Sequence, residues 1–200
     1  MTQSNTNKQE TSNRTKSSPT ITNTQTRTVR LAKMGMLVAL SIVLMMIIRF
    51  PFPPAPFLEY DPADIPILIG TFAFGPIAGL VLTLVTSVVQ GLTVSSGSGA
   101  YGIIMHIIAT GTFVLVAGLI YKWKKTRKTA AIALICGALA MVLIMIPANI
   151  LITPIFMGTP RAAVMGMILP VIVPFNAMKA GINAVVTFLL YKPLSRFLHK

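Results

Sequence analysis

The stretch DPADIPILIGTFAFGPIAGLVLTLVTSVVQGL, residues 61–92, decides the fold of this chain. After Asp64 it contains no charged residue, which favours a membrane interior. A helix needs about 20 apolar residues to cross a bilayer, so the stretch is longer than one crossing and short for two. Gly75-Pro76 interrupts it midway, where one helix can end and another begin. Whether it forms one helix or two sets the number of crossings in the whole chain.

Apolar runs of similar character lie on both sides of this stretch. Hydrophobic residues make up 54% of the 200-residue chain and charged residues 10%, whereas a soluble domain carries about 25% charged residues. Together with a mean hydropathy of +0.77, this composition predicts an all-α integral membrane protein. The expected spans are residues 31–50, 62–74, 76–93, 101–121, 130–153 and 165–191.

Clusters of lysine and arginine decide between one and two helices in residues 61–92. The net charge of +13 lies mostly beside the apolar runs: up to Lys33, in residues 122–128 and from Lys192 onward. This arrangement indicates membrane orientation rather than nucleic-acid binding. If all three clusters face the cytoplasm, an even number of crossings separates Lys33 from residue 122. The sequence therefore predicts six transmembrane helices with both termini cytoplasmic, and a re-entrant segment at 62–74 is the alternative.

The two ends of the chain differ in composition from its middle. Residues 1–29 are mainly Ser, Thr, Asn, Gln and Lys, so we expect a disordered polar cytoplasmic tail. The membrane domain is expected over residues 30–196, followed by a basic tail at 197–200. Cys136 is the single cysteine and excludes an intramolecular disulfide.

Polar residues inside the apolar runs are candidates for ligand binding. An ionisable side chain within a spanning helix is costly and usually faces a cavity or a partner, which singles out Lys179. Asn176 lies one turn earlier on the same helix face, and Asn149 is a further amide in an apolar run. The alternatives are a lysine that reaches the headgroups and, for Asn149, a hydrogen bond between helices.

Three acids follow a proline-rich segment at residues 50–56, which we expect to be an extended, stiff extracellular loop. Asp61 precedes Pro62 and suits a helix N-cap, and Asp64 suits the first helical turn. Glu59 and its neighbour Tyr60 have no such role and are better candidates for contacting a ligand. No catalytic set and no metal site are expected.

Two motifs resemble the S components of energy-coupling factor (ECF) vitamin transporters, in particular the riboflavin-specific members. The first is FLEYDPADIP, residues 57–66, followed by LIG at 68–70 and FGPIAG at 74–79. The second runs from ILP at 168–170 to PFNAMK at 174–179. The resemblance covers residues 31–196 in order. It implies a subunit of the bacterial cell membrane that captures its vitamin from outside.

The resemblance also implies partners and site residues. The family works with a transmembrane coupling subunit of the EcfT type and two cytoplasmic ATPases, which fits the lack of a Walker A motif in this chain. We therefore expect a substrate-binding subunit and not an enzyme. Riboflavin is the implied transported substrate and no cofactor is expected. Asn176, Lys179 and Asn149 match the flavin-binding positions. Gly35 and Ala39 are the nearest match to the family's docking pattern.

Other functions remain open from the residues alone. The same fold can capture a different vitamin, because pocket side chains set specificity. A membrane-embedded enzyme needs histidines and carboxylates clustered at one depth, and the sequence lacks that pattern; His106 stands alone in its run. A small channel or assembly protein is a third class, which would show no saturable binding of a small molecule.

Overall fold

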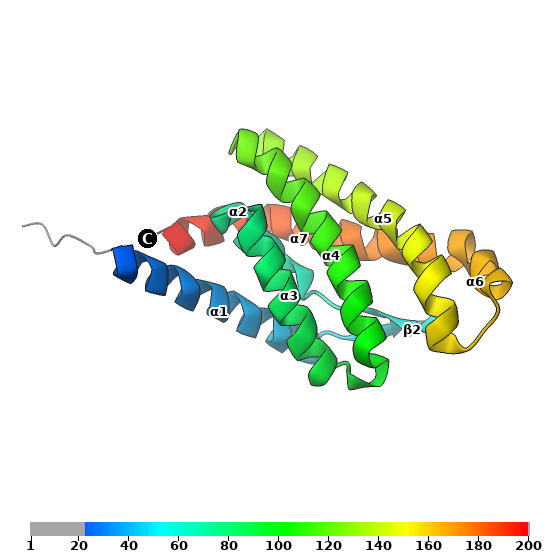
Figure 1. Ribbon diagram of the computed structural model, residues 1–200. Helices are drawn as coiled ribbons and strands as arrows, with labels where there is room; N and C mark the ends of the chain where they lie inside the picture. Colours follow the sequence, from blue (N-terminus) through cyan, green and yellow to red (C-terminus); the bar gives the residue numbers. More distant parts are fainter. Residues whose placement is uncertain (1–22, 200) are drawn as a thin grey trace, which may run out of the picture. The chain divides into compact units, whose positions relative to one another are not determined.

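The computed structural model describes residues 23–199, and nearly all of its structure is helical (Figure 1). The chain divides into a first unit, residues 1–32, and a second unit, residues 33–200; the packing described below belongs to the second. The long helices are α1 (Asn23–Ile47), α3 (Pro76–Leu92), α4 (Gly99–Trp123), α5 (Arg127–Met157) and α7 (Val173–His199). Shorter elements are the hairpin strands β1 (Phe50–Phe52) and β2 (Ala55–Tyr60), helix α2 (Asp64–Phe74), the 3-10 turn η1 (Ser96–Ser98), helix α6 (Arg161–Met167) and the π turn η2 (Ile168–Ile172).

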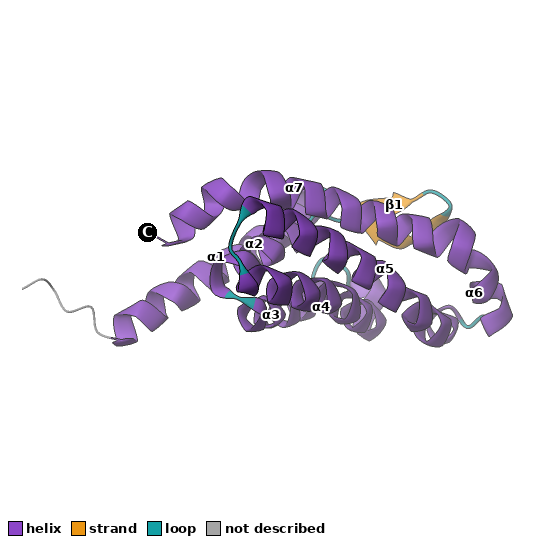
Figure 2. Cartoon of the chain, turned by 90° about the horizontal axis from the view of Figure 1, so that it is seen from above, coloured by secondary structure: helices purple, strands orange, loops and turns teal. Residues whose placement is uncertain are grey.

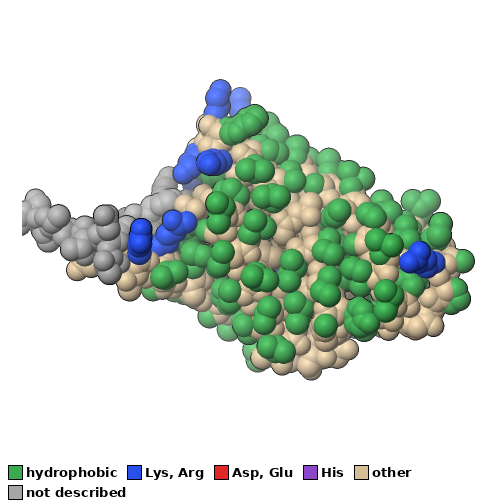
Figure 3. All heavy atoms as spheres, viewed as in Figure 1, with side chains coloured by type: hydrophobic (Ala, Val, Ile, Leu, Met, Phe, Trp, Pro, Cys, Tyr) green, Lys and Arg blue, Asp and Glu red, His purple; other side chains and the backbone are tan. Residues whose placement is uncertain are grey.

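The surface of the helices is that of a membrane protein. Within the described residues, four helical segments are long and apolar enough to cross a bilayer: Arg27–Ile47, Ser96–Trp123, Arg127–Met157 and Arg161–Pro193. Hydrophobic side chains cover much of the face drawn in Figure 3. Lysine and arginine side chains gather over the connection between α4 and α5 (Figure 3). This distribution confirms the prediction of a multi-pass integral membrane protein.

The stretch at residues 61–92 forms two helices, as expected. Helix α2 ends at Phe74, and Gly75 takes a φ of 95°, a left-handed value that glycine adopts without steric cost. Pro76 then occupies the first turn of α3, where its missing N–H costs nothing. Helix α2 is shorter than a membrane crossing, and every residue from Asp64 to Ala73 is buried. Neighbouring parts of the protein therefore cover this short helix.

The proline-rich segment is more ordered than an extended loop. Strands β1 and β2 pair antiparallel, with Phe50 opposite Tyr60 and an irregularity between Pro51 and Phe52. Prolines cannot donate ladder hydrogen bonds, so they favour a short edge hairpin over a larger sheet. The hairpin lies beside the α6 end of the last helical segment (Figure 2), where the rings of Phe52 and Phe175 are 5.4 Å apart. The all-α prediction is therefore corrected to a mostly helical fold with one hairpin.

The ends of several elements differ from the predicted boundaries. Helix α1 begins at Asn23 rather than 31, because adding a residue to a formed helix gains a hydrogen bond at little further cost. The expected disorder of residues 1–29 therefore does not hold from 23 onward, and residues 1–22 lie outside the described part. Helix α7 continues to His199, through most of the expected tail at 197–200. Near Pro170 the chain widens into η2 instead of breaking, because a π turn accommodates the missing N–H.

Candidate functional site

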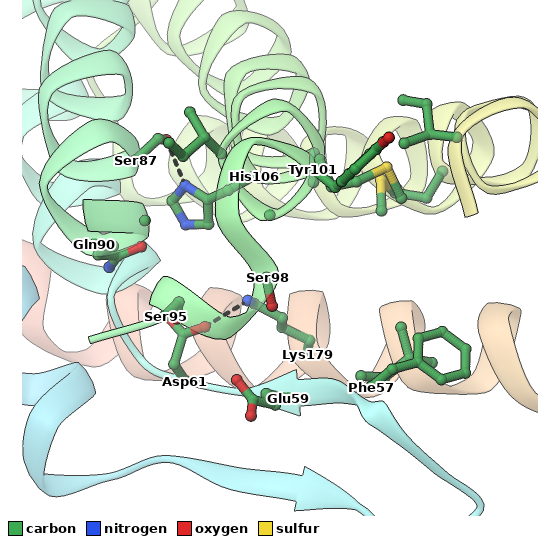
Figure 4. Close-up of a pocket in the computed structure, with 18 of the residues that line it drawn as sticks. Phe57, Glu59, Asp61, Ser87, Gln90, Ser95, Ser98, Tyr101, His106 and Lys179 are labelled. Carbon is green, nitrogen blue, oxygen red and sulfur yellow. Dashed lines mark hydrogen bonds and ion pairs between the residues drawn. The ribbon is translucent and has the colours of Figure 1, made fainter. Parts of the chain in front are cut away.

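A cavity opens among the second unit's helices, beside the hairpin (Figure 4). Its lining includes Gln90 near the end of α3, Tyr101 at the start of α4, Phe156 near the end of α5 and Phe57 in β2. The three helical residues lie at the ends of their helices that are remote in sequence from the α4–α5 connection. The enclosed part of the cavity measures about 160 Å³, and a wider mouth opens from it to solvent.

Part of the wall is aromatic and aliphatic. The rings of Tyr101 and Phe156 lie 5.5 Å apart and join α4 to α5 across the wall. Met141, Met145 and Ile152 add flexible and branched aliphatic side chains from α5. Methionine adapts to irregular shapes, and aromatic rings offer flat apolar faces. This part of the wall suits a planar apolar group.

An ion pair joins the α7 wall to the end of the hairpin. Lys179 Nζ lies 2.8 Å from Asp61 Oδ2, and both residues line the cavity. Lys179 is 8% exposed and Asp61 3%, so neither charge is well hydrated. The other carboxylate oxygen of Asp61 accepts a hydrogen bond from the Ala63 N–H at 3.0 Å. Asp61 therefore holds the turn before α2, whose N-cap is Ala63 rather than Asp61 as predicted. It also neutralises Lys179, which was not predicted.

A second buried acid lies behind this pair. Asp64 accepts hydrogen bonds from Thr110 Oγ1 at 2.6 Å and from Asn183 Nδ2 at 3.0 Å. His106 Nε2 is 3.2 Å from Asp64 Oδ1, without hydrogen-bond geometry, while its Nδ1 contacts Ser87 Oγ at 2.7 Å. His106 and Ser87 line the cavity (Figure 4). The hydrogen bonds explain how a fully buried carboxylate is tolerated here.

The two asparagines predicted for the site both line the cavity and are buried. Asn149 Nδ2 donates to the Met145 carbonyl at 2.8 Å, and its Oδ1 accepts from Thr153 at 2.9 Å. Asn176 Nδ2 donates to the Ile172 carbonyl at 2.8 Å. Each amide uses one of its two N–H groups within its own helix. The amides are thereby held in fixed orientations with further hydrogen-bonding capacity.

The hairpin is connected to the mouth of the cavity by Arg49. Its guanidinium contacts Glu59 Oε2, with Nε at 2.7 Å, and donates through Nη1 to the Val94 carbonyl at 2.5 Å. Glu59 lines the cavity. Tyr60 points elsewhere: its hydroxyl donates to Asn183 Oδ1 at 3.2 Å. Burial and the neighbouring Asp61 carboxylate raise the pKa of the Tyr60 phenol, which keeps it a donor.

The structure thus brings together four of the five residues predicted for substrate binding. Asn176, Lys179, Asn149 and Glu59 all line the cavity, whereas Tyr60 is buried beside it. Gly35 and Ala39, predicted for docking, lie on an exposed face of α1.

Sequence reasoning did not assign Asp61, His106 or Gln90 to the site. The signal that could have identified Asp61 is Lys179, because a lysine inside an apolar helix needs a negatively charged partner. Among the described residues no group of three or more His, Cys, Asp or Glu side chains could hold a metal ion.

Buried polar groups around a partly aromatic cavity, within a bundle of lipid-exposed helices, define a membrane-embedded small-molecule-binding protein. The family model for the ECF transporter substrate-specific component matches residues 29–191, so the chain belongs to that family. It is a multi-pass protein of the bacterial plasma membrane.

Curated relatives match most of the chain. The riboflavin transporter RibU of Staphylococcus aureus is 33% identical, over 86% of this chain and 93% of its own length. The riboflavin transporter FmnP of Bacillus subtilis is 29% identical, over 86% and 94%.

Two solved structures are also similar. One, described as the S component of a bacterial ECF transporter, has a TM-score of 0.76 and 32% identity over 87% of this chain and 99% of its own. ThiT from Listeria monocytogenes, at 16% identity and a TM-score of 0.63 over 86% of this chain and 98% of its own, shares the fold.

Proposed function

We propose that this chain is the S component that captures riboflavin from outside the cell for an ATP-driven ECF importer. The observation that carries this proposal is the cavity, whose lining combines aromatic side chains with buried amides and a paired lysine. Support for the vitamin comes from relatives named as riboflavin transporters, which are 29% and 33% identical over 86% of the chain.

The chemistry of the cavity matches that of a flavin. An isoalloxazine ring is planar and largely apolar, and the faces of Tyr101 and Phe156 and the methionines of α5 offer apolar surface for it. The carbonyl oxygens of the ring need donors, which Asn149, Asn176 and the remaining N–H groups of Lys179 provide. A specific small-molecule site usually has a mainly apolar wall with a small number of polar groups in fixed positions.

The proposed topology has six crossings, with both termini cytoplasmic and the hairpin outside. The basic residues Lys122–Lys128 between α4 and α5 would then face the cytoplasm. Helices α2 and α3 count as crossings although both are shorter than 18 residues. The short α2 can serve because its surface is covered by protein rather than lipid.

We further propose that energy comes from a separate module. An EcfT-type coupling subunit and two cytoplasmic ATPases would hydrolyse ATP, since this sequence contains no Walker A motif. Gly35 and Ala39 are proposed docking residues because they lie on an exposed face of α1, and small side chains allow close helix contact.

A riboflavin titration of the detergent-purified full chain tests the proposed substrate. Saturable quenching of riboflavin fluorescence, unaffected by excess thiamin, is the expected result. Asn176→Ala should weaken binding without lowering the thermal unfolding midpoint of the ligand-free protein. Absence of quenching, or equal competition by thiamin, would exclude riboflavin as the specific substrate and favour another vitamin.

A further inference from the structure

Gln90 carries a hydrogen-bonding group that the folded chain leaves unused. The residue lies in the last turn of α3, is 3% exposed and lines the cavity. Its side-chain nitrogen Nε2 is buried and has no hydrogen-bond partner among the described residues. Most buried polar atoms in folded proteins have a partner, so an exception at a cavity wall suggests that a ligand supplies it.

Exchanging the nitrogen and oxygen of the Gln90 amide does not remove this conclusion. The two ends of a side-chain amide have nearly the same shape, and an exchange would place the oxygen where the nitrogen now lies. The buried position without a partner would remain, with acceptor in place of donor character. A ligand group that can both donate and accept, such as a hydroxyl, satisfies either orientation.

Gln90 shares the cavity with neutral hydroxyl groups, while the charged groups are paired, Lys179 with Asp61 and Glu59 with Arg49. Ser95 and Ser98, from the α3–α4 connection, line the cavity with it, as does Ser87 one turn earlier on α3. Figure 4 shows Gln90 and Ser87 on the opposite side of the view from Phe57 and Tyr101. The cavity therefore has a hydroxyl- and amide-lined part separate from its aromatic part. The hydroxyl groups beside Gln90 can both donate and accept hydrogen bonds, which suits the hydroxyls of an uncharged polyol.

We propose that Gln90 binds the hydroxylated chain of the ligand, and that the serines at the α3–α4 connection line the same polyol subsite. The inference rests on the proposed flavin substrate, whose ribityl chain is a polyol attached to a flat ring. In this arrangement the ring occupies the aromatic part, and Gln90 with its neighbouring serines sets specificity for the side chain.

The test removes the amide of Gln90 and, separately, the polyol of the ligand. Lumiflavin keeps the isoalloxazine ring and has a methyl group where riboflavin has its ribityl chain. Gln90→Leu keeps a side chain of similar size. We expect it to raise the Kd for riboflavin by about tenfold, the typical effect of one lost hydrogen bond in a buried site. Its Kd for lumiflavin should change by less than about twofold.

Each other outcome of this ligand comparison has a defined meaning. Equal losses for both flavins would overturn the polyol assignment, and unchanged affinity for both would remove Gln90 from the site. If the wild-type chain binds neither flavin, the proposed function fails first, and the Gln90 inference fails with it. Ser96→Ala, in the same connection but exposed and absent from the cavity lining, is the matched control and should bind both flavins normally.

Thermal unfolding separates a binding role from a structural one. If Gln90 supported the fold, Gln90→Leu would lower the midpoint of the ligand-free protein. Because the amide nitrogen has no partner in the described structure, we expect that midpoint to stay unchanged or rise. The increase in midpoint caused by saturating riboflavin should shrink. A lowered ligand-free midpoint with an unchanged riboflavin shift would overturn the proposal.

Discussion

Lys179 and Asp61 form a buried ion pair although 118 residues separate them. Removing one partner of such a pair leaves an uncompensated charge, which costs about 3–5 kcal/mol. Lys179→Met should therefore lower the free energy of unfolding, measured in mixed detergent and SDS micelles. Adding Asp61→Asn should recover most of that loss. Equal instability of the single and double variants would contradict a coupled pair.

This pair also shows what single residues in a sequence can reveal. Lys179, Asn176 and Asn149 were predicted to be functional because polar groups inside apolar helices are expensive, and all three line the cavity. Asp61 was assigned only a capping role, since its local neighbours explain an acid at a helix start. Its contact with Lys179 depends on how α7 packs against α2, and no local pattern encodes that packing.

Tyr60 gives a pH-dependent prediction outside the spanning helices. Burial, followed by the negative charge of Asp61, raises the pKa of its phenol above the ordinary value of 10.0. The stabilisation from its protonated form is complete below about pH 10 and is lost as the pH rises through the folded-state pKa. Tyr60→Phe should cost about 1 kcal/mol at neutral pH, since the hydroxyl donates to Asn183.

The measurement is the difference in unfolding free energy between wild type and Tyr60→Phe at a series of pH values. This difference should be constant from pH 7 to about 9 and shrink above about 10. A difference that grows at high pH would contradict the assigned role of the phenol.

Among the elements, the hairpin is the one that sequence reasoning described only partly. Its prolines predicted an extended, stiff segment, but strand pairing depends on which residues face each other. The register of Pro51 opposite Glu59 brings Glu59 to Arg49, and Arg49 to the Val94 carbonyl. These contacts join the hairpin to the segment between α3 and α4. They are tertiary contacts, which the periodicity of the sequence does not encode.

Arg49→Gln should loosen the hairpin without unfolding the protein. The ion pair with Glu59 is about 30% exposed, and pairs of that kind contribute about 0–1 kcal/mol. We therefore expect faster hydrogen exchange in β1 and β2, faster riboflavin dissociation and an almost unchanged unfolding midpoint. Lys124→Gln, an exposed charge in the α4–α5 connection, is the control and should alter none of these. Unchanged exchange in Arg49→Gln would show that the hairpin holds without this contact.

The contact between helices α4 and α5 depends on a glycine. A Cβ atom at Gly137 would lie 2.9 Å from the Phe113 carbonyl oxygen and would also meet the Phe113 ring. Gly137→Ala should therefore force the helices apart and cost about 1–3 kcal/mol of stability. Gly181→Ala is the matched control because a Cβ there meets nothing within 4 Å. Thermal unfolding of both variants checks this, and equal effects would contradict close packing at Gly137.

At the scale of the whole molecule, composition and charge predicted the class because the bilayer imposes strong rules. An apolar chain must form helices to satisfy its backbone, and lysine and arginine must stay near the membrane surfaces. Helix boundaries were less predictable: α1 begins before its apolar part, at Asn23, and η2 carries the last segment past Pro170. Cooperative extension and π turns act through the backbone and leave little trace in side-chain patterns.

The six-crossing topology predicts which connections are reached from outside. In a Cys136→Ala background, which removes the single cysteine, Ser96→Cys places a thiol between α3 and α4, and Lys125→Cys one between α4 and α5. Both positions are exposed. One crossing separates them, so a membrane-impermeant thiol reagent should label Ser96→Cys in intact cells and Lys125→Cys only after permeabilisation. The opposite pattern would place the hairpin and the cavity mouth in the cytoplasm, where capture of an external vitamin is impossible.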